Sequence, residues 1–330
     1  MNPDTCWVCS SPARPFWSNA AFDAVACESC GHIQAQHHPT QAPSTDYHRG
    51  YDQGAFVESL RATRRRQAER MLDALRQIAA NGVTSNSGTP NSDTPNGGAA
   101  HGKLSLFDFG CGRGWFLDSA KERGLAPLAG GDVSELALEL LAQRGINSVR
   151  LHEQEPFERL DFTQLGFTPD VISFLDVIEH FPGDLATRLK PWVQRLPASV
   201  RWLVFKVPVS DGLMFGMANQ ARKLGVGGLC QQLFQVGTFP PHYQYFSRRS
   251  LARFVSSLGL DTLDTLDDLD FEPAELGGRL TSTLPWIRLL GGVAGHVLGG
   301  AATALRRADS RILIAARRPL PGSPPGTSAA

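Results

Sequence analysis

The stretch FDFGCGRGWF (107–116) constrains the fold of this 330-residue chain more than any other segment. Three glycines, Gly110, Gly112 and Gly114, directly follow a short apolar run with the pattern of a strand. Glycine allows a backbone to turn sharply and to approach a ligand closely. In an open α/β sheet, ligands bind outside the carboxyl ends of the strands, and the first strand-to-helix turn is a frequent contact. The loop therefore predicts a ligand-binding turn between a strand and a helix.

The glycine spacing argues against a dinucleotide as the ligand. A dinucleotide-binding loop has the pattern Gly-x-Gly-x-x-Gly. Counted from Gly110, the third glycine of that pattern would stand where this chain has Trp115. An indole at that position blocks the close helix–strand packing that the glycine permits. The sequence therefore disfavours a nicotinamide dinucleotide.

From residue 103 onward, strand patterns alternate with helix patterns. We expect seven strands, within 104–109, 126–132, 146–151, 169–175, 200–208, 260–271 and 310–319. We expect helices between them at 116–124, 134–145, 184–195 and 247–259. Such alternation is typical of an open, Rossmann-like α/β sheet whose strands are mostly parallel.

Four segments of this region, in order, resemble the class I S-adenosylmethionine-dependent methyltransferases. FDFGCGRG (107–114) is similar to the first motif of that family, and GGDVSELAL (130–138) to its second-strand acid motif. DVISFLDVIEHF (170–181) is similar to its fourth-strand motif. PPHYQYFSRRSLARFVSSLGL (240–260) resembles a "His … Tyr-Phe, then helix" segment of its bacterial small-molecule branch. The resemblance spans about 103–318 and implies S-adenosylmethionine as the methyl donor.

Acidic residues near strand ends are the expected partners of the glycine loop in binding the donor. Asp132 stands 18 residues after Gly114, and a carboxylate there can accept both ribose hydroxyls of an adenosyl ligand. The resemblance implies that Asp108 lies near the methionine end of the donor, directly or through the loop backbone, and that Asp176 borders the same site. The alternatives are a structural carboxylate that binds loop amides for Asp108 and a helix cap for Asp132.

The residue that would contact adenine is left open by the sequence. The family implies an acid or amide after the third strand, and Glu153, Gln154 and Glu155 all satisfy that description. Cys111, inside the glycine loop, is expected to be a small packing residue, because no partner base is visible in the sequence.

Two histidines are candidates for activating the acceptor. Methyl transfer from a sulfonium depends mainly on alignment, but an alcohol or phenol still gains from a base that titrates near neutral pH. His180 and His242 lie in segments expected around the pocket, and a structural or donor-proximal role is the alternative for each. FLDVIEH (174–180) stands where amino-methylating enzymes carry Asn/Asp-Pro-Pro-Tyr. We therefore expect transfer to oxygen of a small molecule or glycan.

Four cysteines near the N-terminus have the spacing C-x2-C-x17-C-x2-C: Cys6, Cys9, Cys27 and Cys30. In a reducing compartment this pattern indicates metal ligation rather than disulfides. Four thiolates complete a closed tetrahedral zinc shell, so the predicted zinc is structural, with His32 outside the ligand set. Two unrelated thiol pairs or a redox site are the alternatives.

The predicted organisation is a zinc-ribbon module, a helical connector, a disordered linker or loop, a methyltransferase domain and a disordered tail, at 1–50, 51–80, 81–102, 103–318 and 319–330. The linker and tail are too poor in apolar residues to order themselves. In the connector helix, RATRRR (61–66) is expected on the solvated side.

Charge disfavours nucleic acid as a partner. The chain holds 32 Lys+Arg against 32 Asp+Glu, and its first 60 residues hold two arginines against six acids. Such a ribbon suits phosphate backbones poorly. A ribbon before a methyltransferase core instead resembles a bacterial subgroup linked to sugar and glycan modification. The alternatives are a zinc-ribbon rRNA methyltransferase and a non-catalytic scaffold. With no apolar signal at its N-terminus, the chain is expected in the cytoplasm.

Two segments are candidates for contacts beyond the core. LPWIRLLGGVAGHVLGGAATAL (284–305) is long enough to span a bilayer, but Pro285, Arg288 and His296 interrupt it, so we expect no span. Peripheral membrane contact is one reading, and intramolecular or homodimer packing through its regularly spaced glycines is the other. Residues 212–237 are expected to form either an apolar lid over the acceptor or a surface helix pair.

Overall fold

The computed structural model describes residues 4–19, 22–37, 54–81, 103–225, 234, 240–270, 296–297, 300 and 307–318. The predicted linker beyond Asn81, the predicted tail and most of the 284–305 segment lie outside these residues. Within the part of the chain just given, no helix combines the length and the apolar character needed to cross a bilayer.

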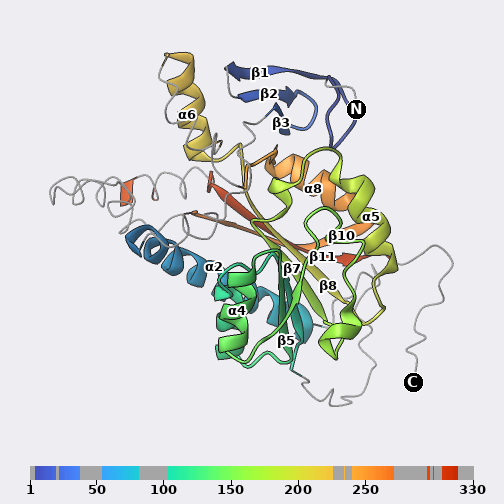
Figure 1. Cartoon of the computed structure of the whole chain (residues 1–330). Coiled ribbons are helices and arrows are strands. Elements are labelled where there is room, and N and C mark those ends of the chain that lie inside the picture. Colours follow the sequence, from blue (N-terminus) through green and yellow to red (C-terminus); the bar gives the residue numbers. More distant parts are fainter. Residues whose placement is uncertain are drawn as a thin grey trace.

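The central sheet has seven strands, which are β4 (Leu106–Phe109), β5 (Leu128–Asp132), β6 (Asn147–Arg150), β7 (Val171–Leu175), β8 (Trp202–Pro208), β10 (Leu260–Asp268) and β11 (Ser310–Arg317). Their order is β10-β11-β8-β7-β4-β5-β6 (Figure 1). β11 runs antiparallel to both neighbours, and the other neighbouring pairs are parallel. The predicted mostly parallel, seven-stranded, Rossmann-like sheet is therefore confirmed.

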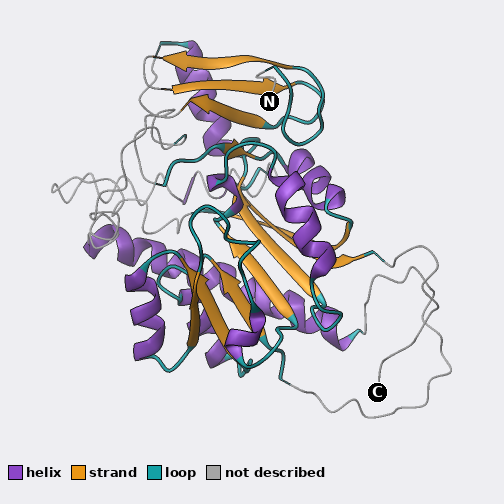
Figure 2. Ribbon diagram, turned by 45° about the vertical axis from the view of Figure 1, so that its right-hand side comes forward, coloured by secondary structure: helices purple, strands orange, loops and turns teal. Residues whose placement is uncertain are grey.

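Helices cover both faces of this sheet (Figure 2). They are α2 (Gly54–Ala80), α3 (Trp115–Glu122), α4 (Glu135–Gln143), α5 (Leu185–Arg195) and α8 (Arg248–Ser257). Along β8, Trp202 and Val204 point to the core under α2, α3 and α4, whereas Leu203 and Phe205 point to the core under α5 and α8. Successive strand residues face opposite sides, so strands buried on both faces must be apolar throughout. This explains the unbroken apolar runs in the sequence.

The connector helix α2 corrects one expectation. Its residues Met71, Leu72 and Leu75 are buried against the sheet, as the periodicity predicts. The RATRRR stretch is not uniformly solvated, however, because Thr63 is fully buried and Arg64 forms ion pairs at the edge of the sheet. Arg64 reaches Asp176, which directly follows β7, so this part of the helix borders the carboxyl ends of the strands. The prediction was therefore wrong for these side chains.

A second, small sheet lies at one end of the central sheet (Figures 1 and 2). It is antiparallel, with the order β1 (Ala13–Asn19), β2 (Phe22–Cys27), β3 (Ile33–His37) and β9 (Gln244–Tyr245). The first three strands belong to the predicted ribbon, but β9 comes from the segment that carries His242. The ribbon is thus joined to the rest of the chain by strand pairing.

The described part of the expected lid packs on the small sheet. It forms α6 (Leu213–Lys223), whose Phe215 and Ala218 are buried in one cluster with Phe22 and Tyr245. Figure 1 shows α6 beside β1, β2 and β3. This helix packs on the small sheet, and residues 226–233 and 235–239 lie outside the described residues, so the choice between a lid and a helix pair stays a prediction.

Candidate active site and metal centre

The glycine loop between β4 and α3 has the shape of a ligand cradle. Gly110, Gly112 and Gly114 have φ angles of +72°, +49° and +72°, which favour glycine. A Cβ on Gly110 would lie 2.6 Å from Val177 Cγ2, and one on Gly114 would lie 2.5 Å from Leu141 Cδ2. Among the residues that the structure describes, no atom would lie within 4 Å of a Cβ on Gly112. The outer glycines therefore serve packing, whereas the middle one faces open space.

Asp132 closes the cradle from the end of β5. Its Oδ2 accepts a hydrogen bond of 2.8 Å from the amide of Gly112, and its Oδ1 accepts one of 2.9 Å from the amide of Ser134. This carboxylate thus fixes the loop, whereas the residue that caps α4 is Ser134, whose Oγ accepts a hydrogen bond from the amide of Ala137. Each carboxylate oxygen can accept more than one hydrogen bond, so the bonds to Gly112 and Ser134 do not by themselves prevent Asp132 from binding ribose hydroxyls.

Asp108 lies beside it near the end of β4 and is 3% exposed. Burial raises the pKa of its carboxyl group to about 7, and the charge of Asp132 adds to this effect. Ser173 Oγ donates a hydrogen bond of 2.7 Å to Oδ1, which stabilises the carboxylate and acts in the opposite direction. Cys111, in the same loop, is buried, and burial raises the pKa of its thiol, as suits a packing residue.

These features fit an adenosyl sulfonium donor. The open side of Gly112 admits a ligand, and two carboxylates stand near the ends of adjacent parallel strands. The candidate adenine contacts Glu153, Gln154 and Glu155 all lie exposed after β6. The Glu155 carboxylate accepts a hydrogen bond from Arg159 at 2.6 Å, and nothing in this loop selects one of the three.

Asp176 lies in a charged cluster that the sequence analysis missed. Its carboxylate forms ion pairs with Lys206 Nζ at 2.5 Å and with Arg64 at 2.8 Å. Both cations also pair with Asp270, Lys206 at 2.9 Å and Arg64 at 3.0 Å. Lys206 is 1% exposed in the middle of β8. A lysine inside the apolar run VRWLVFKVP (200–208) is the sequence signal that could have revealed the cluster. A donor contact for Asp176 stays a prediction.

The two candidate histidines are brought together. The ring centroids of His180 and His242 are 4.6 Å apart in an edge-to-face arrangement. His180 lies in the short 3-10 helix η2 (Ile178–His180) that follows β7, and its Nδ1 is 3.0 Å from the carbonyl oxygen of Pro241. A carbonyl only accepts, so Nδ1 carries the proton and Nε2 keeps its lone pair. Burial lowers the pKa of His180, which favours this neutral form.

Glu179 completes the group and is 1% exposed. Among the described residues, neither of its carboxylate oxygens has a hydrogen-bond partner. Burial raises the pKa of Glu179 well above its usual range, and the charge of Asp176 adds to the effect. Each of the three residues Glu179, His180 and His242 offers one potential ligand atom, and these atoms lie within 4.8 Å of one another.

The four ribbon cysteines also converge. The Sγ–Sγ distances are 3.6 Å for Cys6–Cys30 and 3.5 Å for both Cys9–Cys27 and Cys9–Cys30. A disulfide would need about 2.05 Å, whereas tetrahedral zinc with bonds of about 2.3 Å places sulfurs about 3.8 Å apart. The donor set therefore fits zinc.

The two knuckles that carry these cysteines share one turn geometry. In the first, the amide of Ser10 donates to the carbonyl of Cys6 at 2.9 Å, and in the second, the amide of Gly31 donates to Cys27 at 2.8 Å. Ser10 and Gly31 both have positive φ angles, of 57° and 73°. Each knuckle thus presents its two sulfurs from one tight turn.

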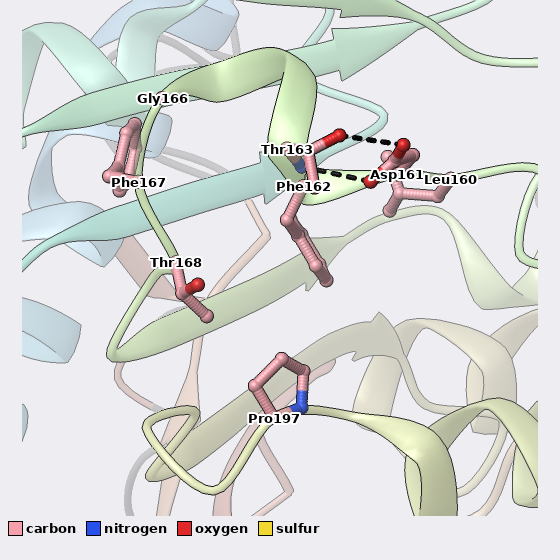
Figure 3. A pocket seen from close by; sticks show the side chains of 8 residues that line it. All are labelled: Leu160, Asp161, Phe162, Thr163, Gly166, Phe167, Thr168 and Pro197. Carbon is pink, nitrogen blue, oxygen red and sulfur yellow. Dashed lines mark hydrogen bonds between the residues drawn. The ribbon is translucent and has the colours of Figure 1, made fainter.

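A separate depression of about 490 Å³ lies elsewhere and is not part of this site. Figure 3 shows its lining, which includes Phe162, Thr168 and Pro197. Thr168 precedes β7, so the depression lies at the amino end of the strands, opposite the glycine loop. Ligands of open α/β sheets bind at the carboxyl end.

A family model described as "Methyltransferase domain" matches residues 60–265. No curated protein matches the chain.

Solved structures with a similar fold include three methyltransferases. Magnesium protoporphyrin IX methyltransferase from Synechocystis PCC 6803 is 18% identical, with 82% of this chain and 92% of that chain covered and a TM-score of 0.43. The 1,6-didemethyltoxoflavin-N1-methyltransferase from Burkholderia thailandensis is 15% identical, with 93% of this chain and 100% of that chain covered and a TM-score of 0.44. A SAM-dependent methyltransferase from Archaeoglobus fulgidus is 20% identical, with 66% and 87% covered and a TM-score of 0.39.

All three TM-scores are below 0.5, so the assignment rests on the family match and on the strand order of the central sheet. The chain belongs to the methyltransferase domain family and is a class I S-adenosylmethionine-dependent methyltransferase.

Proposed function

We propose that this enzyme methylates an oxygen atom of a small-molecule or glycan acceptor. The observation that carries the proposal is the pairing of His180 with His242 at the carboxyl end of the sheet, beside the buried Glu179. A hydroxyl group is a poor nucleophile until it loses its proton, and a neutral imidazole with a free lone pair suits that task.

S-adenosylmethionine, when bound, supplies a methyl group on a sulfonium that is already reactive. The protein then has to hold and align the reactants. In the proposed arrangement Asp132 binds the ribose hydroxyls, the open side of Gly112 lets the ligand approach the backbone, and Asp108 lies toward the cationic methionine end. The pKa of Asp108, raised to about 7 by burial, falls when a cationic group lies beside it.

His180 is the better oriented of the two candidate bases. Its Nδ1 hydrogen is held by the Pro241 carbonyl, so Nε2 accepts the proton of the acceptor hydroxyl. His242 borders the same space, and the Tyr245 hydroxyl donates to its main-chain carbonyl at 2.7 Å, which fixes that segment. Tyr245 itself is buried among aromatic rings, so it serves packing rather than acceptor contact.

The ribbon cysteines are proposed to hold one structural zinc. All four ligands come from the protein, which leaves no open position for chemistry. The ribbon is a poor surface for RNA, because its Arg14 is paired with Glu28 at 3.1 Å. These observations favour a small acceptor over the rRNA alternative.

Methyl transfer from labelled S-adenosylmethionine to a panel of nucleotide sugars and phenols tests the proposal. We expect an O-methyl product by mass spectrometry and NMR, and a rate reduced by about 10²-fold or more in His180→Gln. Glu122→Gln, an exposed change on α3, is the control and should keep the wild-type rate. Transfer only to nitrogen, carbon or RNA would contradict the proposal, and binding of S-adenosylhomocysteine without turnover of any acceptor would favour the scaffold.

A further inference from the structure

The group formed by Glu179, His180 and His242 has a second reading as a metal site. Its three potential ligand atoms lie within 4.8 Å of one another. Metal–ligand bonds of about 2.1 Å require ligand atoms no more than about 4.2 Å apart, so binding contracts the cluster by at most about 0.6 Å. Rotation of side chains covers that change.

We propose that Glu179, His180 and His242 bind a divalent cation of the manganese or zinc class, as a second metal centre distinct from the cysteine site. The inference rests on the proposed function and deepens it by assigning the group that activates the acceptor oxygen. Three protein ligands leave coordination positions open, in contrast to the closed cysteine shell.

The state of Glu179 is the first argument. An isolated carboxyl group costs free energy when it is buried without a hydrogen bond. Glu179 is 1% exposed, and the described residues offer no partner to either oxygen. A cation between Glu179 and the imidazoles would supply the missing interaction.

The fixed geometry of the ligands is the second argument. The Pro241 carbonyl holds Nδ1 of His180 at 3.0 Å, and such a bond orients the ring of a metal-binding histidine and leaves its other nitrogen for the metal. The amide of Tyr243 donates to the carbonyl of Glu179 at 2.8 Å, so the two segments that supply the ligands are tied together.

The charge balance around the group is the third argument. The neighbouring Asp176 is already neutralised by Lys206 and Arg64, so Glu179 is the carboxylate available to the cation. A divalent cation with one carboxylate and two neutral imidazoles carries a net charge of +1. Such a centre stabilises an alkoxide or phenolate, and two nitrogen ligands favour manganese or zinc over magnesium.

The resulting step is balanced without a further reactant. A hydroxyl oxygen of the acceptor binds to the cation, which lowers its pKa, and its proton passes to water. The oxygen–carbon bond then forms as the carbon–sulfur bond of the donor breaks, which yields a methyl ether and S-adenosylhomocysteine. In this form His180 and His242 are ligands, and the cation takes the role assigned above to an imidazole base.

Titration of Mn²⁺ into full-length protein that holds one zinc equivalent per chain, in the cysteine site, tests the inference when free Mn²⁺ is followed by electron paramagnetic resonance. Mn²⁺ prefers oxygen and nitrogen over thiolate ligands, so it leaves the cysteine site occupied by zinc. We expect one Mn²⁺ per chain in the wild type and in Glu122→Gln, with affinity at least about tenfold weaker in Glu179→Gln and in His242→Ala. Retained zinc and unchanged S-adenosylhomocysteine binding verify that the variants are folded.

No Mn²⁺ binding to protein that binds S-adenosylhomocysteine, or equal Mn²⁺ binding in Glu179→Gln, overturns the metal site and leaves the proposed O-methylation with an imidazole base. The reverse outcome, Mn²⁺ bound as expected but methyl transfer only to nitrogen or carbon, overturns the proposed function while the metal site stands. The two failures are therefore distinguishable.

Discussion

The main-chain amide of Ala35 donates a hydrogen bond of 2.8 Å to the main-chain carbonyl of Tyr243. This bond connects β3 of the ribbon to the residue that follows His242. A second link runs from Ser247 Oγ to the carbonyl of Cys30, also a ribbon residue, at 2.7 Å. The cysteine knuckle and the candidate acceptor site are thus two ends of one hydrogen-bonded unit.

Loss of the zinc proposed for the ribbon should therefore impair catalysis more than donor binding. We expect Cys9→Ser to lose one zinc equivalent per chain and to lower the rate of methyl transfer by about tenfold or more, because misplaced reacting groups slow a reaction strongly. Its affinity for S-adenosylhomocysteine should stay within about threefold of the wild type, since Asp108 and Asp132 lie on other strands. Zinc analysis, calorimetry and rate assays check this, with Glu28→Gln, an exposed change on the other knuckle, as control. Equal losses of rate and affinity would contradict it.

Asp132→Ala should weaken S-adenosylhomocysteine binding by about 10- to 100-fold, because hydrogen bonds to a charged group contribute about 1.5–3 kcal/mol. Part of this loss reflects the loop amide of Gly112, which Asp132 fixes at 2.8 Å. Calorimetric titration measures the change. Asp161→Asn, an exposed change near the depression of Figure 3, should bind like the wild type. Wild-type affinity in Asp132→Ala would remove Asp132 from the donor site.

Alanine at two loop glycines should separate stability from binding. Gly110→Ala forces a Cβ to within 2.6 Å of Val177, so we expect a large fall in the melting temperature. Gly112→Ala meets no atom within 4 Å and should cost about 1–2 kcal/mol for its left-handed backbone. Its methyl group would nonetheless occupy the ligand side and weaken S-adenosylhomocysteine binding. Thermal melts compare the stability of the two variants, and calorimetry compares their affinity for S-adenosylhomocysteine. A larger fall in melting temperature in Gly112→Ala, with the weaker binding in Gly110→Ala, would contradict the roles assigned to the two glycines.

Asp108 should make stability fall as pH rises. Its pKa is raised from 3.8 to about 7 in the folded protein, so between these values the folded state binds more protons than the unfolded state. Three pKa units correspond to at most about 4 kcal/mol. Asp108→Asn has no titrating carboxyl group at this position. Its free energy of unfolding should therefore rise relative to that of the wild type as the pH increases from 4 to 7. Urea unfolding of both proteins across that range tests this expectation. A difference in free energy of unfolding that stays constant with pH would contradict it.

Lys206→Met should lower the free energy of unfolding by about 3 kcal/mol, because it leaves Asp176 and Asp270 without a buried cation. Arg64 still pairs with both acids, which limits the loss. Lys190→Met, an exposed change on α5, should stay within about 0.5 kcal/mol. Chemical denaturation of the two variants measures the difference, and similar values would show that the cluster adds little to stability.

The sequence by itself determined the strands of the central sheet, the order of motifs and the grouping of the four ribbon cysteines. Each of these depends on local spacing: apolar runs that must be buried on both faces, glycines that must turn, and thiols three residues apart. The runs at 104–109 and 200–208 contain β4 and β8 for this reason.

Only the tertiary structure decided which distant residues meet. His180 and His242 stand 62 positions apart, Arg64 and Asp270 stand 206 positions apart, and β9 completes a sheet begun by the ribbon. None of these contacts leaves a periodic trace in the sequence, because they depend on how whole helices and sheets pack rather than on the conformation of neighbouring residues. That packing converts a solvated-looking arginine and a lone strand lysine into one ion-paired cluster at the edge of the site.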